Sequence, residues 1–358
     1  MDYNSIRRKS KKIKVGDMYI GGDAHVSIQS MTNTDTHDKE KTYAQVVALR
    51  EAGCEIVRLA VPDCEAAKTF AYLKERGVGV PLVADIHFDY KIALECVASG
   101  ADKIRINPGN IGDSDRIKAV SDACRRKGLP IRIGVNSGSL EKHILQKYGA
   151  PTPEALAENA LYNASLLNRF DFDDIAISVK ASDVYSMIKA NRILAAQTQY
   201  PLHLGVTEAG GVASGTVKSA VGIGALLSEG IGDTVRVSLT ADPVREIKAA
   251  RDILSALDIL EDKGMDIVSC PTCGRTKIDL IPLLERFESE LDRTGLRKKH
   301  LKVAFMGCVV NGPGEAREAD VGIAGGIDEA VLFKKGQIVG RIPADRIVEE
   351  LIEEISRM

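Results

Sequence analysis

The chain has no surplus of charge of either sign. Its 358 residues include 48 Lys and Arg against 50 Asp and Glu, which gives a formal net charge of -2. A nearly neutral protein has no global field that would draw it to nucleic acid or to an anionic membrane. We therefore expect neither as a partner, and any site for an anionic ligand must be built locally.

Long apolar runs are absent too. No stretch approaches the ~20 apolar residues that a transmembrane helix needs. The basic N-terminal segment from Arg7 to Lys14 is not followed by an apolar run of signal-peptide length. These two absences predict a cytoplasmic protein without a membrane-spanning segment.

The cysteine usage of a disulfide framework is missing as well. Seven Cys, an odd number in a chain of this length, indicate reduced thiols, a subset of which takes part in metal chemistry. Four of them, Cys54, Cys64, Cys96 and Cys124, lie in or beside predicted helices without paired spacing. We interpret these four as buried small hydrophobic residues.

A repeating unit fills residues 26 to 258: a short Val- and Ile-rich run, a polar or Gly-containing turn and an amphipathic helical stretch. The unit occurs eight times, with predicted strands at Val26–Ser30, Ile56–Ala60, Leu82–Ile86, Lys103–Ile106, Ile131–Val135, Ile175–Val179, Leu202–Val206 and Thr234–Val237. The predicted helices are Lys39–Glu51, Ala66–Glu75, Tyr90–Ala98, Asp115–Arg126, Pro153–Leu167, Asp183–Gln197, Gly215–Ser228 and Pro243–Leu257. Consecutive βα units with short connections favour a closed (β/α)₈ TIM barrel over an open doubly wound sheet. The Gly-x-Gly-x-x-Gly phosphate fingerprint of the open fold does not follow the first strand.

The pattern changes after residue 258. A polar linker over residues 259–265 leads to a strand that runs into Cys270 and a helix over Ile278–Glu290. Further strands near Val303–Met306, Val321–Ala324, Glu329–Phe333 and Ile338–Arg341 precede a final helix, Asp345–Arg357. We therefore expect two domains, a substrate-binding TIM barrel over residues 1–258 and a small α+β domain over residues 259–358.

Polar residues gather where the predicted barrel strands end, which is where the active sites of such barrels lie. They are Arg58, Asp85, His87, Arg105, Asn107, Asn136, Lys180, Thr207, Glu208, Arg236 and Ser238. Alternate residues of a strand face the same side. Asp85 is therefore expected to share a face with His87, and Arg105 with Asn107. The same spacing relates Arg236 to Ser238.

Four of these strand-end residues are cations: Arg58, Arg105, Lys180 and Arg236. Placing four cations together is costly unless an anion lies among them, and Arg and Lys are the residues that bind phosphate groups. The alternative is that they form ion pairs inside the barrel with Asp85 and Glu208. Two carboxylates cannot neutralise four cations, so the pattern favours a polyanionic ligand.

Two further strand-end residues are candidates for a role in catalysis. His87 is either a hydrogen-bond donor to phosphate, a proton carrier or a purely structural residue. Glu208 is the carboxylate with no cation two residues away, which favours a functional role. His203 lies inside a predicted strand and is expected to pack in the barrel wall.

Three cysteines in the second domain form a moderately specific metal pattern: Cys270-Pro-Thr-Cys273, and Cys308 in Met-Gly-Cys-Val-Val-Asn-Gly-Pro-Gly-Glu. Three thiolates leave a four-coordinate site one ligand short, with Glu315 and His300 as nearby candidates. A structural zinc site using His300 is one alternative; an iron–sulfur cluster that leaves one iron for a weaker ligand is the other. The Asn-Gly-Pro-Gly turn brings Glu315 back toward Cys308, which favours the second.

At this point the motifs resemble those of a known family. Cys-Pro-Thr-Cys-Gly-Arg and Gly-Cys-Val-Val-Asn-Gly-Pro-Gly-Glu, together with Ser-Met-Thr-Asn-Thr-Asp-Thr at 30–36 and Arg-Ile-Asn-Pro-Gly-Asn at 105–110, resemble the 4-hydroxy-3-methylbut-2-enyl diphosphate synthase family. These are iron–sulfur enzymes of the non-mevalonate isoprenoid pathway. The chain lacks the long insertion of the plant members and is similar to the compact bacterial form.

The resemblance implies reductive dehydroxylation of 2-C-methyl-D-erythritol 2,4-cyclodiphosphate by two electrons that pass singly through a [4Fe-4S] cluster. Reduced flavodoxin or ferredoxin is the implied donor, and a homodimer the implied assembly, because in the family one subunit's cluster domain caps another's barrel. The implied cluster ligands are Cys270, Cys273, Cys308 and Glu315. The residues implied in substrate binding are Arg58, His87, Arg105, Asn107, Asn136, Lys180, Arg236 and Ser238, and the strand-end pattern adds Asp85 and Thr207 to this set. Glu208 resembles the carboxylate beside the reacting carbon. The alternative function is a phosphate- or pterin-binding barrel transferase or hydrolase with a structural zinc domain.

Overall fold

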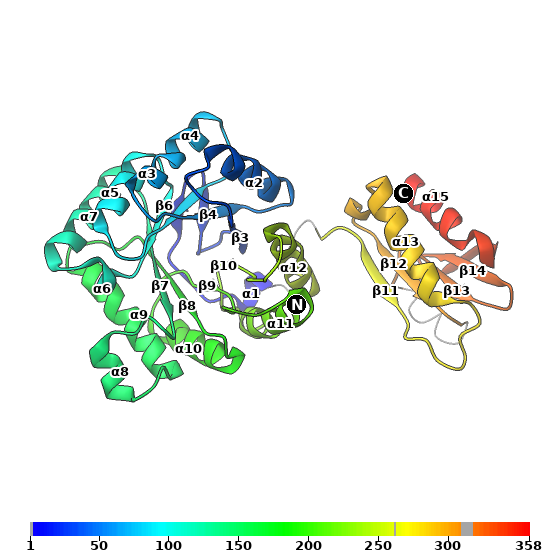
Figure 1. Ribbon diagram of the computed structural model, residues 1–358. Coiled ribbons are helices and arrows are strands. Elements are labelled where there is room, and N and C mark those ends of the chain that lie inside the picture. Colours follow the sequence, from blue (N-terminus) through cyan, green and yellow to red (C-terminus); the bar gives the residue numbers. More distant parts are fainter. Residues whose placement is uncertain (1–2, 261–262, 309–317) are drawn as a thin grey trace. The chain divides into compact units, whose positions relative to one another are not determined.

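The computed structural model describes residues 3–260, 263–308 and 318–358 of the chain. The chain divides into two compact units, Met1–Ile259 and Leu260–Met358. Figure 1 shows each unit with its own sheet and helices.

The first unit is built on an eight-stranded parallel sheet. Its strands are β3 (Ser27–Met31), β4 (Ile56–Ala60), β5 (Leu82–Asp85), β6 (Lys103–Ile106), β7 (Ile131–Asn136), β8 (Ile175–Lys180), β9 (His203–Leu204) and β10 (Thr234–Val235). They pair in the order β8-β7-β6-β5-β4-β3-β10-β9. A parallel bridge between Ile177 and Leu202 joins β8 to β9, so the two ends of the sheet meet. The prediction of a (β/α)₈ barrel is confirmed.

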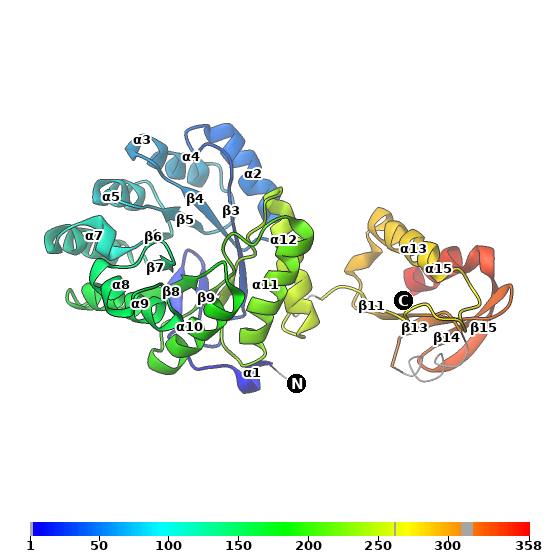
Figure 2. The ribbon, with the colours of Figure 1, turned by 60° about the horizontal axis from the view of Figure 1, so that its bottom comes forward.

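Helices surround this sheet in Figures 1 and 2. They are α2 (Lys39–Glu51), α3 (Cys64–Ala67), α4 (Thr69–Glu75), α5 (Tyr90–Ala98), α6 (Pro108–Ile111), α7 (Ser114–Lys127), α8 (Lys142–Tyr148), α9 (Pro153–Asn168), α10 (Val184–Gln197), α11 (Val212–Leu227) and α12 (Pro243–Ala256). Several begin directly after an Asp whose carboxylate accepts a first-turn N–H, as Asp38 does for α2 and Asp183 for α10. None of the helices in the described residues is long and apolar enough to cross a membrane.

An N-terminal segment that was not predicted covers one end of the barrel. It comprises α1 (Tyr3–Ile6) and an antiparallel hairpin of β1 (Ile13–Val15) and β2 (Met18–Ile20). Apolar side chains of the hairpin pack against Ile56 and Val83 at the starts of β4 and β5. Arg7, one of the basic N-terminal residues, is held by an ion pair of 2.9 Å to the buried Asp233.

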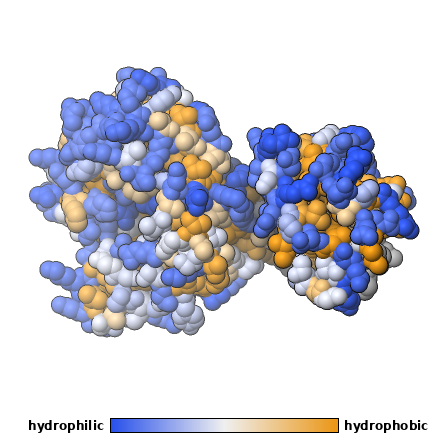
Figure 3. Space-filling model, turned by 45° about the vertical axis from the view of Figure 1, so that its right-hand side comes forward, coloured by the Kyte–Doolittle hydropathy of each residue, from blue (hydrophilic) through white to orange (hydrophobic). Residues whose placement is uncertain are grey.

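In its described residues the second unit is a five-stranded mixed sheet with two α-helices. The strands β11 (Asp266–Ser269), β12 (Lys302–Met306), β13 (Val321–Gly325), β14 (Glu329–Lys334) and β15 (Gln337–Pro343) pair in sequence order. The first three are parallel and the last two antiparallel to their neighbours. Helices α13 (Leu280–Thr294) and α15 (Ile347–Arg357) place Phe287 and Leu351 in one core with Phe305 of β12. Figure 3 shows apolar side chains at the surface of this unit, where Ile327, Ile338 and Val339 are among the exposed ones.

The four cysteines outside the motif do not all behave as predicted. Cys54, Cys96 and Cys124 are buried, and burial raises the pKa of the Cys54 and Cys124 thiols to about 12. Cys64, however, is exposed, so its interpretation as a buried residue is wrong. It begins the short helix α3, whose buried positions are taken by two Ala residues.

Candidate active site

A pocket of about 250 Å³ lies at the C-terminal ends of the barrel strands. Its lining includes the predicted residues Arg58, Asp85, His87, Arg105, Asn136, Lys180, Thr207, Arg236 and Ser238, together with Arg132, Gly134, Val135 and Ser178, which were not predicted. Asp85, Asn136 and Lys180 are the last residues of β5, β7 and β8. Neighbouring parallel strands thus deliver these side chains to one place.

Asp85 is shared by three basic residues of the pocket. Its Oδ1 lies 3.0 Å from Arg105, and its Oδ2 lies 3.7 Å from Arg58 and 3.8 Å from His87. Burial acts to raise the pKa of this carboxyl, but the neighbouring guanidinium groups outweigh burial and lower it to about 2. Burial also lowers the pKa of Arg58 to about 10. Both groups are therefore charged at neutral pH, and Asp85 fixes the two arginines in position.

Arg105 occupies space that only glycine leaves open. Its guanidinium donates to the carbonyl oxygen of Gly134 over 3.0 Å and lies across the Cα of that residue. A Cβ at position 134 would stand 2.2 Å from the Nε of Arg105. Gly134 on β7 is therefore part of the site, because it admits the side chain that comes from β6.

Arg236 has an acidic partner that was not predicted. Glu246 of α12 lies 3.3 Å from its Nε, and both side chains are largely buried. The same carboxylate accepts hydrogen bonds from Ser30 Oγ at 2.8 Å and from the Leu239 backbone N–H at 3.1 Å. In the alternative interpretation Glu208 is the second acid of the barrel ion pairs; the structure has Glu246 in that position instead.

Two cations of the pocket have no acidic partner within 4 Å among the described residues. Burial lowers the pKa of Lys180 well below its usual value, and the nearby arginines add to this effect. Arg132 is 1% exposed and donates to Gln29 Oε1 over 2.8 Å. The pocket thus gathers five Lys and Arg side chains, the four predicted cations and Arg132, against the two carboxylates of Asp85 and Glu246. This excess of positive charge suits a ligand with several negative charges.

Two predicted site residues do not line this pocket. Asn107 is buried, and its amide donates to the carbonyl oxygen of Ser139 over 3.3 Å. Glu208 directly follows Thr207 of the lining, but its side chain is exposed and its φ is +53°. A left-handed backbone at a non-glycine residue is strained, and such strain is concentrated at functional sites. The roles of both residues stay predictions.

The three motif cysteines follow neighbouring strands of the smaller unit. Cys270 comes directly after β11 and Cys308 two residues after β12, and these strands are parallel and paired. The backbone N–H of Gly307 donates to Cys270 Sγ over 3.1 Å. Hydrogen bonds from the backbone and side chain of Arg275 lower the pKa of the Cys273 thiol. His300 lies before β12 at its other end, roughly 20 Å along the strand from Cys308.

These observations fit an iron–sulfur site in their donor chemistry. Cys270 and Cys308 follow the C-terminal ends of two paired strands, a backbone N–H is directed at the sulfur of Cys270, and a cationic side chain lies beside Cys273. Within the described residues, no three His, Cys, Asp or Glu side chains are arranged to hold a metal ion. The fourth predicted ligand, Glu315, lies outside the described residues.

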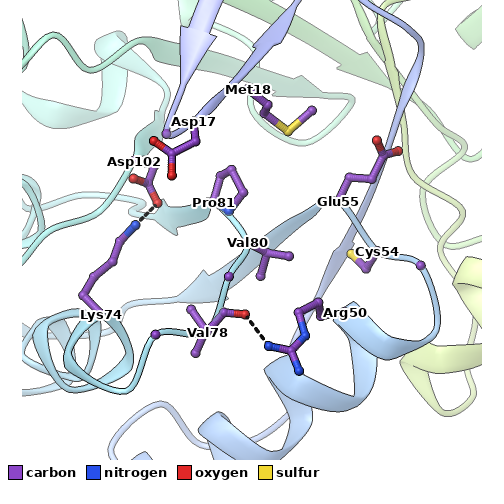
Figure 4. A pocket seen from close by; sticks show the side chains of 14 residues that line it. Asp17, Met18, Arg50, Cys54, Glu55, Lys74, Val78, Val80, Pro81 and Asp102 are labelled. Carbon is purple, nitrogen blue, oxygen red and sulfur yellow. Dashed lines mark hydrogen bonds and ion pairs between the residues drawn. The ribbon is translucent and has the colours of Figure 1, made fainter.

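A larger cavity, of about 670 Å³, lies on the opposite side of the barrel, among the loops that precede the strands. Figure 4 shows that both cations drawn there have partners: Lys74 pairs with Asp102 at 2.5 Å, and Arg50 donates to the carbonyl oxygen of Val78 over 3.1 Å. In a (β/α)₈ barrel this face contributes to stability rather than to chemistry. We therefore place the site in the smaller pocket.

Comparisons with known proteins extend over both units. Residues 10–251 match the GcpE TIM-barrel domain, and residues 266–357 match the GcpE protein C-terminal domain. A 4-hydroxy-3-methylbut-2-en-1-yl diphosphate synthase (flavodoxin) of Ruminiclostridium cellulolyticum is 57% identical over 352 residues, 98% of each chain. A protein of the same name from Clostridium perfringens is 56% identical over 349 residues, 98% of this chain and 99% of its own.

Among solved structures, the type I 3-dehydroquinate dehydratase of Clostridium difficile is similar with a TM-score of 0.51. It is 14% identical over 70% of this chain and 98% of its own, which shows the barrel fold alone. The family matches are stronger evidence than this likeness of fold. They cover both the barrel with its cationic pocket and the unit with the three cysteines. The resemblance drawn from the sequence motifs is confirmed: the chain belongs to the GcpE family.

Proposed function

We propose that this protein is a flavodoxin-dependent 4-hydroxy-3-methylbut-2-enyl diphosphate synthase, an oxidoreductase of isoprenoid biosynthesis. It opens the ring of 2-C-methyl-D-erythritol 2,4-cyclodiphosphate and removes one hydroxyl group with two electrons that pass through a [4Fe-4S] cluster. The observation that carries the proposal is the excess of Lys and Arg in the barrel pocket, where five such side chains face two carboxylates. A cyclic diphosphate supplies the negative charge that this pocket is built to receive.

Substrate binding is assigned to the strand-end cations. Arg58 and Arg105, held by Asp85, present their remaining N–H groups to the pocket. Lys180 has no acidic partner within 4 Å in the described part of the chain, and a bound diphosphate would restore its charge by raising its pKa. The polar residues His87, Asn136, Thr207, Ser238 and, more remotely, Asn107 complete the proposed set.

Proton transfer is assigned to Glu208. The departing hydroxyl group must gain a proton to leave as water, and an exposed carboxyl beside the pocket is suited to donate or relay it. The strained backbone at Glu208 supports this role, since the fold maintains an unfavourable φ there. His87, 59% exposed and 3.8 Å from Asp85, is the second candidate and acts either as a proton carrier or as a phosphate donor.

The cluster is assigned to the smaller unit. Cys270, Cys273 and Cys308 would hold three of its irons, with Glu315 as the displaceable fourth ligand. The cluster, when bound, supplies single electrons and a Lewis-acidic iron to the substrate. The Gly307 N–H and the Arg275 side chain would stabilise the charge on the thiolates.

Two partners follow from this assignment. Reduced flavodoxin is the proposed electron donor, with ferredoxin as the alternative, and the substrate is the cyclic diphosphate. A homodimer is the proposed assembly, and the exposed apolar side chains of the smaller unit suit a surface that a second subunit covers. The cytoplasmic location stays a prediction.

Anaerobic purification followed by turnover tests the proposal. We expect a brown protein with broad absorption at roughly 400 nm and about four irons per chain. It should convert the cyclodiphosphate with reduced flavodoxin, and reduced ferredoxin assayed in parallel identifies the better donor. A colourless protein that holds one zinc and shows no turnover would instead support a transferase or hydrolase with a structural zinc domain, an alternative that the family membership does not favour.

A further inference from the structure

Met31 ends β3, a strand that lies between β4 and β10 in the barrel sheet. On one side β4 carries Arg58, whose Cα is the register partner of Met31, and on the other side Arg236 directly follows β10. Met31 belongs to the Ser-Met-Thr-Asn-Thr-Asp-Thr segment at 30–36, which includes no member of the proposed substrate-binding or cluster sets. The strand order thus places a thioether between two of the arginines that line the pocket.

The sulfur of Met31 contacts both guanidinium groups. Its Sδ lies 3.0 Å from Nε and 2.8 Å from NH2 of Arg58, and 3.8 Å from NH1 of Arg236. A thioether sulfur is a weak hydrogen-bond acceptor that carries no charge. The Nε–NH2 edge of Arg58 therefore has its acceptor in Met31, which leaves the NH1 end of this guanidinium for a ligand.

The carboxylates beside these arginines do not take the place of the sulfur. Asp85 lies 3.7 Å from Nε of Arg58, which is too long for a hydrogen bond. Glu246 accepts from the Nε and NH2 of Arg236 at 3.3 and 3.4 Å, so the NH1 of that residue is the group that faces Met31. A neutral acceptor orients a guanidinium without cancelling its charge, whereas a third carboxylate would reduce the positive charge that the pocket offers to an anion.

The residues on both sides of Met31 tie it to the same arginines. Ser30 donates from its Oγ to Glu246, the acidic partner of Arg236, over 2.8 Å. The backbone N–H of Thr32 donates to the carbonyl oxygen of Arg58 over 3.0 Å, which continues the pairing of the two strands beyond Met31. The end of β3 is therefore fixed against the elements that carry both arginines.

We propose that Met31 is a positioning residue for the substrate, whose thioether holds Arg58 and Arg236 in the geometry that binds the diphosphate. The identity of this ligand rests on the proposed function. Met31 itself does not line the pocket, so it acts on the ligand through the two arginines. Loss of the sulfur should weaken binding of substrate and transition state alike, which raises KM and leaves kcat nearly unchanged.

Met31→Leu tests this role, because it removes the sulfur and nearly conserves the volume of the side chain. In anaerobically purified protein with its cluster, KM should rise roughly three- to tenfold, and so should the Kd of the cyclodiphosphate measured by calorimetry without reductant, with kcat within about twofold. Met31→Gln supplies a neutral acceptor again and should recover most of the affinity. Met18→Leu is the matched control, because Met18 is also partly buried but lies in β2, at the other end of the barrel. It should change neither constant.

A double variant separates positioning from packing. In an Arg58→Ala background, Met31→Leu should lose most of its effect on Kd, because the interaction that it removes is already gone. The Tm of Met31→Leu should fall by no more than about 5 °C. A wild-type Kd in Met31→Leu, or losses that add in the double variant, overturns the proposal. A lower kcat and a lower cluster content at unchanged KM would assign Met31 to packing alone and would overturn it too.

The proposed function can fail separately from this inference. If the wild-type protein does not turn over the cyclodiphosphate, the proposed function is wrong, and the same variants are then titrated with inorganic diphosphate. A weaker affinity of Met31→Leu than of Met18→Leu for inorganic diphosphate supports the positioning role whatever the reaction is. Equal affinities, or a wild-type protein that binds neither anion, show that the role assigned to Met31 is wrong.

Discussion

A single methyl group at position 134 should disable the pocket without removing any of its charges. In the native barrel the guanidinium of Arg105 crosses Gly134 so closely that an added Cβ would stand 2.2 Å from Nε and 2.5 Å from NH2. Neither atom can stay there, because real Cβ contacts are not that short. The backbone at Gly134 does not have a positive φ, so alanine fits the strand and the side chain of Arg105 must move.

The magnitude follows from what Arg105 is proposed to do. A charge-assisted contact to phosphate is worth about 1.5–3 kcal/mol, so Arg105→Ala should weaken binding of the cyclodiphosphate roughly ten- to a hundredfold. Gly134→Ala should lose most of the same affinity, and the double variant should bind no more weakly than Arg105→Ala alone, because both changes remove one interaction.

Isothermal titration calorimetry with the cyclodiphosphate measures these affinities. The matched control is Gly224→Ala, where a Cβ would meet nothing within 4 Å and the affinity should stay within about twofold. Wild-type affinity in Gly134→Ala would refute the placement of Arg105 or its contact with phosphate. Losses that add in the double variant would show that Gly134→Ala acts elsewhere.

Three further predictions concern single carboxylates and one histidine. Glu208→Gln should keep the absorption of the cluster and lose most turnover; unchanged turnover would remove Glu208 from the mechanism. Glu246→Gln leaves Arg236 without its buried partner, so urea unfolding should show a loss of about 3–5 kcal/mol, and a loss below about 1 kcal/mol would mean that the pair contributes little. The pKa of His37 is raised by hydrogen bonds to Asp35 and Asp63, so the stability it adds is complete below pH ~6.5 and is lost as the pH rises through the folded-state pKa. An NMR titration of His37 should therefore have its midpoint above ~6.5, and a lower midpoint would contradict the two ion pairs.

Much of the barrel could be predicted because its periodicity is strong. The strands Ile56–Ala60 and Lys103–Ile106 and the helices Lys39–Glu51 and Tyr90–Ala98 have the predicted bounds. The hairpin over residues 13–20 was missed, since strands of three residues show too little alternation to be recognised. The last two barrel strands are shorter than predicted, because strand length depends on which neighbours pair and an apolar run does not reveal that.

The site was predictable where it follows strand alternation and not where it depends on tertiary packing. Arg132 could have been found, because it shares a strand face with Asn136 four residues later. Glu246 could not, since it lies on a helix surface, and no spacing in the sequence indicates that its carboxylate reaches Arg236 and Ser30. Glu208 is exposed and has a left-handed backbone conformation. A glutamate in the sequence gives no indication of that conformation.

The arrangement of charges suggests why the barrel tolerates so many cations at one end. Asp85 forms ion pairs with two arginines of the pocket, and Glu246 forms one with Arg236. These arginine side chains are therefore held in position before any ligand binds. Lys180 and Arg132 have no such partner among the described residues, and burial, with the repulsion of nearby arginines, disfavours their charged forms. A diphosphate would therefore gain most from these two, because the fold has already removed them from water and has not paired them. The ion pairs provide the geometry of the pocket, and the unpaired cations provide its preference for a polyanion.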